Sequence, residues 1–280
     1  MNRSILLPTD FSENAWSAIL YAIRLYHHKP CTFYLFHTWA FINSDARTYI
    51  TTSHINELKK EAAQELETLK EKVEIESSNT KHEFKTIFSA NDFLSSIAST
   101  IEKHHIDLII MGTKGSSGVG RILFGSNTVS LINRIQSCPI LAIPDGFEFV
   151  TPKHLAFPTD YNRFYDDELK HLKHFSDLYA SKIKVLHVHT RQDHDLSEKQ
   201  NYNLAMLKAY LEEYPHSFHW AKGDDKKEIA INNFIDEFDI DILIMINYKH
   251  NFIENMMKEP IIKKIGFHPK VPFLVIPSLG

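Results

Sequence analysis

Short apolar runs alternate with segments of helical period along the whole chain. Leu108–Met111 (LIIM) and Ile242–Met245 (ILIM) are apolar without a break, so they lack the polar–apolar alternation of a half-exposed strand. Uninterrupted apolar runs are typical of strands that are buried on both faces. The pattern predicts parallel sheets with helices on both sides. Right-handed crossovers then leave the carboxyl ends of the strands at one edge, where ligands bind.

A long amphipathic helix is predicted within residues 43–78. Leu58, Ala62, Leu66 and Leu69 recur there at helical spacing among lysines and glutamates. Such a stripe buries one face of a helix and leaves the other in water. We therefore expect a surface helix in this stretch.

The chain repeats itself. Pro8-Thr9-Asp10 returns as Pro158-Thr159-Asp160 at an offset of 150, and Ile106–Met111 returns as Ile240–Met245 at an offset of 134. The matched blocks follow one order, which indicates a duplicated domain with its boundary near Asp145–Lys153. We expect one domain over residues 1–146 and another over residues 152–280. The second copy is about sixteen residues shorter between its second and fourth strands.

Composition narrows the class of protein. The 280 residues are 43% hydrophobic and carry a formal charge of −4, and no basic stripe favours nucleic acid. No apolar run approaches the roughly 20 residues that span a bilayer. Two cysteines, Cys31 and Cys138, fit a reducing compartment and are expected to be buried packing residues. We expect a soluble cytoplasmic protein; its seventeen histidines show no pattern that predicts a metal site.

A glycine pattern follows the strand at Leu108–Met111. Gly112, Gly115 and Gly125, with Ser126 directly after, read G-x2-G-x9-G-S. Glycine lets a backbone come close to a ligand, and amides at a helix N-terminus attract anions. The spacing suits a phosphate site, although it is not a P-loop, because no Gly-Lys-Ser/Thr run occurs. The alternative interpretation is that these glycines only serve turns.

Residues 106–144, with that pattern, resemble the ATP-binding signature of the universal stress protein family. The opening ILLPTDFSENAWSAI, residues 5–19, resembles the first strand and helix start of the same family. The resemblance implies two tandem doubly wound domains. Each would be a mainly parallel five-stranded sheet with helices on both faces, of the adenine nucleotide alpha hydrolase-like type.

The resemblance also assigns site residues in the first half. Asp10 takes the position that contacts the nucleoside, Thr38 lines the adenine pocket, and Met111 and Gly112 flank the ribose and α-phosphate. The complete set implied for ATP, with or without Mg²⁺, is Pro8, Thr9, Asp10, Thr38, Met111, Gly112, Gly115, Gly125, Ser126 and Asn127. For Asp10 the alternative is a purely structural role, as the N-cap of a helix that starts near Glu13.

The second half lacks the glycine pattern. In the repeat, Gly112 corresponds to Ile246 and Gly115 to Lys249, while Gly125 and Ser126 correspond to Lys258 and Glu259. Side chains then fill the places where backbone would approach phosphate. We expect a degenerate domain that does not bind ATP in the same way and serves as a structural partner or binds something else.

The function that the resemblance implies is a stress-response regulator that binds ATP in its N-terminal half and acts through a protein partner. ATP would order the loop from Gly115 to Gly125 and so change the surface shown to the partner. The short apolar strands at Pro139–Ile143 and Pro272–Ile276 predict a pseudo-dimer between the halves, since exposed edges invite pairing. Two chains could associate further into a homodimer.

Two other functions stay open at this point. One is an enzyme that transfers adenylate or hydrolyses ATP slowly, although neither an SGGxDS loop nor a HIGH-like motif is present. The other is a scaffold or small-ligand binding module that holds a lipid, a metabolite or a protein and no nucleotide.

Overall fold

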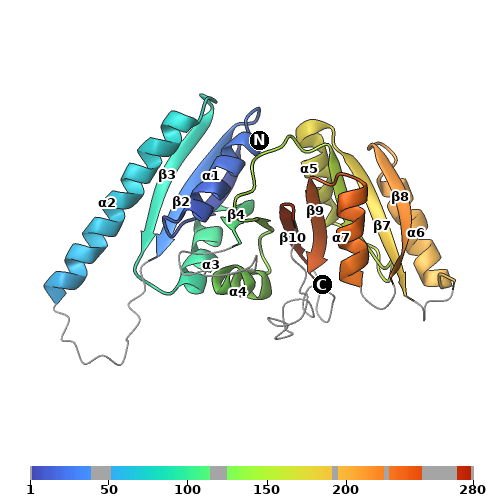
Figure 1. The fold of residues 1–280 in the computed structure, drawn as a ribbon. Helices are drawn as coiled ribbons and strands as arrows, with labels where there is room; N and C mark the ends of the chain where they lie inside the picture. Colours follow the sequence, from blue (N-terminus) through green and yellow to red (C-terminus); the bar gives the residue numbers. More distant parts are fainter. Residues whose placement is uncertain are drawn as a thin grey trace. The chain divides into compact units, whose positions relative to one another are not determined.

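The computed structural model describes residues 2–38, 52–113, 125–190, 195–223, 227–247 and 270–278. The chain forms two compact units, Met1–Phe149 and Val150–Gly280, here called the first and second domains (Figure 1). Each domain is an α/β unit built from strand–helix–strand crossovers.

The first domain contains a parallel five-stranded sheet in the order β3-β2-β1-β4-β5. Its strands are β1 (Arg3–Pro8), β2 (Cys31–Thr38), β3 (His82–Ser89), β4 (Leu108–Gly112) and β5 (Ile140–Ile143). Its helices are α1 (Glu13–Leu25), α2 (Thr52–Glu76), α3 (Phe93–His104) and α4 (Ser126–Arg134).

The second domain repeats this order as β10-β9-β6-β7-β8, again with parallel neighbours. Its strands are β6 (His154–Pro158), β7 (Lys182–Thr190), β8 (His216–Gly223), β9 (Ile242–Asn247) and β10 (Phe273–Pro277). Its described helices are α5 (Leu169–Tyr179), α6 (Glu198–Tyr210) and α7 (Lys227–Glu237). The fold class predicted from the sequence is therefore confirmed.

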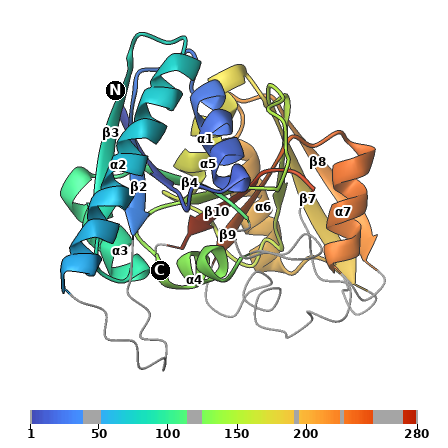
Figure 2. The ribbon, with the colours of Figure 1, turned by 60° about the vertical axis from the view of Figure 1, so that its left-hand side comes forward.

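The order of the strands determines where a ligand crevice opens along the sheet of each domain. In the first domain the chain runs from β1 through β2 to β3 and then returns to β4 on the other side of β1. With right-handed crossovers this puts α1 and α2 on one face of the sheet and α3 and α4 on the other (Figure 2). The direction of winding thus reverses between β1 and β4, and such a reversal opens a crevice at the carboxyl ends of the strands. In the second domain the reversal lies between β6 and β9.

The apolar runs form the centre of each core. Every side chain of Leu108–Met111 and of Ile242–Met245 is buried, as the unbroken apolar pattern predicts. Burying one such Leu or Ile contributes roughly 1.5–3 kcal/mol. Both cysteines are buried and unbridged, and burial raises the pKa of the Cys31 thiol to about 12. Their predicted role as packing residues is confirmed.

The predicted surface helix is α2. Ala62, Leu66 and Val73 are buried on its inner side, while charged residues line its outer side. At 25 residues it is longer than its counterpart α6, which has 13, and this accounts for most of the length difference between the two copies. No helix in the described part of the chain is long and apolar enough to cross a membrane.

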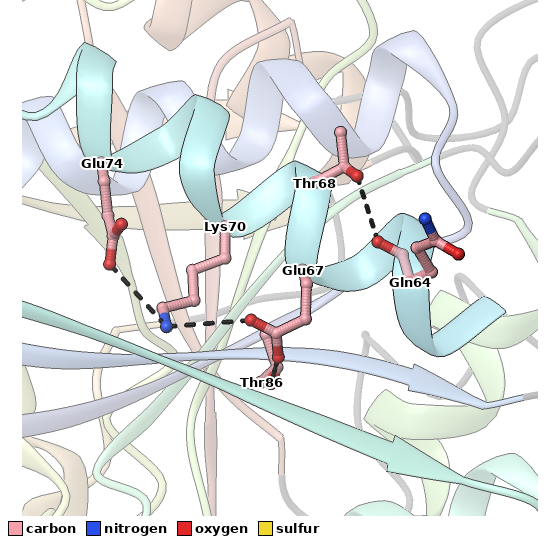
Figure 3. A network of polar contacts seen from close by, with 6 residues as sticks. All are labelled: Gln64, Glu67, Thr68, Lys70, Glu74 and Thr86. Carbon is pink, nitrogen blue, oxygen red and sulfur yellow. Dashed lines mark hydrogen bonds and ion pairs between the residues drawn. The ribbon is translucent and has the colours of Figure 1, made fainter. Parts of the chain in front are cut away.

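A polar network ties α2 to the neighbouring strand β3 (Figure 3). The ammonium of Lys70 lies 3.8 Å from the carboxylate of Glu67 and 4.0 Å from that of Glu74. Glu67 also accepts a hydrogen bond from the Thr86 hydroxyl on β3. Exposed pairs of this kind add only about 0.3–0.5 kcal/mol each, so the buried stripe of α2 does more to hold the helix in place.

Candidate functional site

A pocket of about 230 Å³ lies at the carboxyl edge of the first sheet, at the reversal between β1 and β4. Nine of the ten residues expected at the site line it, and Gly115 lies outside the described residues together with most of the loop that leads to Gly125. The lining residues expected from the sequence are Pro8, Thr9, Asp10, Thr38, Met111, Gly112, Gly125, Ser126 and Asn127. Five further residues line the pocket: Ala15, Phe36, His37, Phe93 and Thr128.

A tight turn after β1 fixes Asp10 at the pocket. The Thr9 amide donates to the Phe36 carbonyl oxygen at 2.8 Å, and the Phe11 amide donates to the Thr9 hydroxyl at 3.0 Å. Phe11 has a φ of 62°, in the left-handed region that few non-glycine residues adopt. The Ser12 amide and hydroxyl both donate to Oδ1 of Asp10, at 3.2 and 2.6 Å. The exposed carboxylate is thereby held in one orientation.

Ser12, not Asp10, caps helix α1. The Ser12 side chain accepts a hydrogen bond from the Ala15 amide at 3.2 Å, and Ser12 has the extended φ and ψ of an N-cap. The alternative in which Asp10 serves only as the cap of this helix is therefore wrong. The left-handed residue Phe11 separates Asp10 from the helix and leaves its carboxylate at the pocket.

Gly112 is required by packing. A Cβ atom at this position would fall 2.9 Å from the carbonyl oxygen of Asn14 and collide with the Asn14 side chain. Asn14 is buried in the first turn of α1, and its side-chain Nδ2 donates to the carboxylate of Asp145 at 3.3 Å. The close approach of α1 to β4 therefore depends on this glycine.

The N-terminus of α4 forms the opposite part of the lining. Gly125 is its N-cap, with φ −61° and ψ 154°, and its amide donates to the Thr113 carbonyl oxygen. The N-caps of helices α1 and α3 are Ser12 and Asp92, whose side chains accept hydrogen bonds from first-turn amides. Gly125 has no side chain to do so. The first-turn amides of α4, at exposed Ser126 and Asn127, are therefore suited to an external anion.

The end of β2 contributes a ring and a hydroxyl. His37 donates from Nδ1 to the Thr9 carbonyl oxygen at 2.8 Å, and its ring centroid lies 4.6 Å from that of Phe11. Thr38 follows, and Phe93 at the start of α3 also lines the pocket. Planar ligands pack well against such aromatic and apolar walls. Sequence reasoning missed His37 and Phe93, although both stand at element ends on the ligand edge.

The second domain keeps the turn. The Tyr161 amide donates to the Thr159 hydroxyl at 3.1 Å, Tyr161 has a φ of 56°, and His187 donates from Nδ1 to the Thr159 carbonyl oxygen at 3.0 Å. These contacts match those of Phe11, Thr9 and His37 one by one. Since the same turn occurs in both halves, its geometry alone does not define a ligand.

Strand register confirms how the halves correspond. Ile5 pairs with Leu108, and Leu155 with Ile242, so the offsets of 150 and 134 hold at the centre of each sheet. Gly112 pairs with Ile143 on β5, and its counterpart Ile246 pairs with Ile276 on β10. The other expected replacements, Lys249, Lys258 and Glu259, lie outside the described residues.

Comparison with known proteins identifies the family. The model of the Universal stress protein family matches residues 1–144. The chain belongs to this family. It is 30% identical over 145 residues to a universal stress protein of Methanocaldococcus jannaschii. The matched segment covers 50% of this chain and 81% of that protein. This places the chain in a stress-response family.

Solved structures extend the similarity of fold to the whole chain. A universal stress protein from Archaeoglobus fulgidus matches 98% of this chain and 96% of its own, with 19% identity and a TM-score of 0.72. A protein of unknown function from Pseudomonas aeruginosa matches 98% of this chain and 92% of its own, with 14% identity and a TM-score of 0.59. This universal stress protein therefore shares its complete two-domain fold with other proteins.

Proposed function

We propose that the first domain binds ATP, with or without Mg²⁺, and that the protein is a nucleotide-dependent regulator that acts through a protein partner in the stress response. One observation carries the proposal. A single pocket at the carboxyl edge of the sheet is lined both by the N-terminus of α4, capped only by Gly125, and by the aromatic and hydroxyl groups at the ends of β2 and α3.

The lining divides by chemistry in a way that fits a nucleotide. The amides at Ser126 and Asn127, next to the N-cap Gly125, suit phosphate oxygens, because helix N-termini favour anions. Asp10 can accept hydrogen bonds from ribose hydroxyls. Thr38, with His37 and Phe93 beside it in the lining, suits the planar base.

A cation would come with the nucleotide. Mg²⁺ takes oxygen ligands, often one or two carboxylates together with phosphates. Among the described lining residues the acidic side chain is Asp10. We therefore expect Mg²⁺ to be held mainly by the phosphates of ATP.

The two domains differ in this proposal. The first keeps the glycine motif, and the second is a degenerate copy in which Ile246 takes the place of Gly112. The proposed protein partner, the pairing of the two halves through their last strands and the association of two chains stay predictions.

Gly125→Asp tests the site without disturbing the backbone. The φ of −61° at Gly125 suits any residue, and Asp is a favourable N-cap. The new carboxylate would accept hydrogen bonds from the α4 amides and would repel phosphate. Two like unit charges about 4 Å apart repel each other by about 4 kcal/mol at an effective dielectric constant of about 20. In equilibrium dialysis with ATP we expect affinity to fall at least tenfold, while the thermal unfolding temperature stays the same or rises.

Ser197→Asp is the matched control, because it places a carboxylate at the N-cap of α6 in the second domain. This variant should bind ATP like the parent protein. Unchanged ATP affinity in Gly125→Asp, or an equal loss in Ser197→Asp, would contradict the assignment of the nucleotide to the α4 N-terminus.

A further inference from the structure

The second domain contains a pocket of its own at the carboxyl ends of its strands. It measures about 300 Å³, at the lower end of the range of roughly 300–1,000 Å³ typical of ligand pockets. Most of the described lining residues are apolar or aromatic, and they come from β6, β7, β9, α7 and the segment after β6. Its lining residues include Asp160, Tyr165, Val188, Lys227, Met245 and Ile246.

Ile246 explains why this pocket differs from that of the first domain. At the equivalent Gly112, even a Cβ atom would collide with Asn14 in the first turn of α1. An isoleucine therefore leaves no room for a helix that starts in the same place. In agreement, α5 begins at Leu169, whereas an offset of 150 from α1 would start it at Arg163.

The non-helical segment between β6 and α5 contributes an aromatic side chain to the pocket. Tyr165, the counterpart of Ala15, lines the pocket, and its hydroxyl lies 2.9 Å from that of Thr159. Glu168 holds this segment by pairing with Arg163 and by accepting from the Asp166 amide at 3.2 Å. The small side chain of the first domain is thus replaced by a fixed tyrosine.

A cation replaces the aromatic residue at the start of the next helix. Lys227 is the first residue of α7, as Phe93 is of α3, and the offset of 134 is the one that relates β4 to β9. Both residues line their pockets. Lys227 therefore adds a full positive charge at the positive end of a helix, where an anion is stabilised.

Among the described lining residues the acidic one is Asp160, and both of its carboxylate oxygens accept hydrogen bonds from Asn162. Oδ1 of Asp160 accepts from the Asn162 amide at 3.0 Å, and Oδ2 accepts from the Asn162 side chain at 2.8 Å. Val188 stands where the first domain has the hydroxyl of Thr38, so the wall next to β7 is apolar. Among the described lining residues, Lys227 supplies the cation, Thr159 and Asp160 are polar, and the others are apolar or aromatic.

We propose that the second domain binds a small monocarboxylate with an apolar body in this pocket. The carboxylate pairs with Lys227 at the N-terminus of α7. The apolar body lies against Tyr165, Val188, Met245 and Ile246. This site is separate from the proposed ATP site, so the two proposals fail independently.

Calorimetric titration of the full chain tests the site with 3-phenylpropionate and octanoate, and with 3-phenylpropan-1-ol as the uncharged counterpart. At least one acid should bind with one equivalent per chain, roughly tenfold or more tighter than the alcohol, because hydrogen bonds to charged groups are the stronger ones. Lys227→Met should remove this preference and leave alcohol binding unchanged. Lys199→Met, at an exposed position of α6, is the control and should behave like the parent.

Ile246→Trp, which fills the pocket, should abolish binding of acid and alcohol alike; thermal unfolding confirms that each variant is folded. Variants Val188→Trp and Met245→Trp replace it if it does not fold. Failure of both acids to bind would overturn the proposal. So would a preference for acid over alcohol that survives in folded Lys227→Met, or stoichiometric displacement of the acid by ATP.

Discussion

Gly112 stands where β4, helix α1 and the first pocket meet. Because Gly112 has no side chain, the carbonyl oxygen and side chain of Asn14 occupy the space that a Cβ atom would need. The Thr128 hydroxyl in turn donates to the Gly112 carbonyl oxygen at 3.1 Å, which links β4 to α4. A single glycine therefore fixes the helices on both sides of the pocket.

Gly112→Ala should destabilise the first domain. The added methyl group overpacks the contact with Asn14, and overpacking of a well-packed site costs typically about 1–3 kcal/mol. Urea unfolding gives the change in the free energy of unfolding. Asn14→Ala in the same chain removes the side-chain part of the clash, so the double variant should lose less than the sum of the single ones. Strict additivity would show that the contact is not the cause.

For single residues, the sequence predicted which of them line the pocket better than it predicted the role of each. Nine motif residues do gather at one pocket, because strand ends at one edge are predictable from the crossover rule. The capping role considered for Asp10 was wrong, since a left-handed φ at Phe11 moves the cap to Ser12. His37 and Phe93 were missed because they carry no motif and join the site only through their neighbours in space.

Helix α1 begins in the same turn that positions Asp10. Ser12 accepts from the Ala15 amide and donates its own hydroxyl to Asp10, so one side chain serves the helix and the pocket. Helix α4 differs, because Gly125 leaves its first-turn amides to other acceptors. The pocket thus combines one helix end with a satisfied cap and another suited to an anion.

Ser12→Ala should therefore affect both stability and binding. Loss of an N-cap side chain costs about 0.5–2 kcal/mol, and Asp10 loses the shorter of its two Ser12 contacts. We expect a lower free energy of unfolding and weaker ATP binding, measured by urea unfolding and dialysis. Ser12→Thr keeps the hydroxyl and should preserve most of both. If Ser12→Ala kept the parent's stability, the assigned cap would be wrong.

The helices and strands themselves were largely readable from the sequence. Buried strands such as β4 and β9 follow from unbroken apolar runs, and α2 follows from its stripe of apolar residues. The late start of α5 did not follow, because Asn162–Tyr165 aligns with the start of α1 at an offset of 150. We attribute this late start to Ile246, which stands where Gly112 lets α1 approach β4; a residue so far away along the chain leaves no trace in a local pattern.

Each domain contains a half-buried histidine that favours its neutral form. His82 donates from Nε2 to the Tyr26 carbonyl oxygen at 3.1 Å and lies 2.8 Å from the Ser77 hydroxyl; burial lowers its pKa. His219 packs against Phe238 at 4.6 Å between ring centroids, and burial, with Lys184 and Lys182 nearby, lowers its pKa.

Both domains should lose stability on mild acidification. The folded-state pKa of each histidine lies below the ordinary value of 6.5, so the unfolded chain takes up more protons as the pH falls through that value. Urea midpoints at pH 7.5, 6.5 and 5.5 should therefore fall in this order. His82→Gln, which does not titrate, should flatten the dependence for the first domain. A slope unchanged by this variant would rule out His82 as a source.

On the scale of the whole molecule, one fold occurs twice with different pocket chemistry. The first domain has Gly112, Ala15 and Phe93 at its pocket, and the second has Ile246, Tyr165 and Lys227 at the equivalent positions. Shared turns after β1 and β6 show that the scaffold was kept while the lining changed. Each chain should therefore hold a single ATP.

Calorimetric titration of ATP with Mg²⁺ into the full chain measures this number directly. We expect one equivalent per chain, which is lost in Gly125→Asp and unaffected by saturating 3-phenylpropionate. Two equivalents would contradict the division of roles between the domains. No binding at all would contradict the ATP site itself.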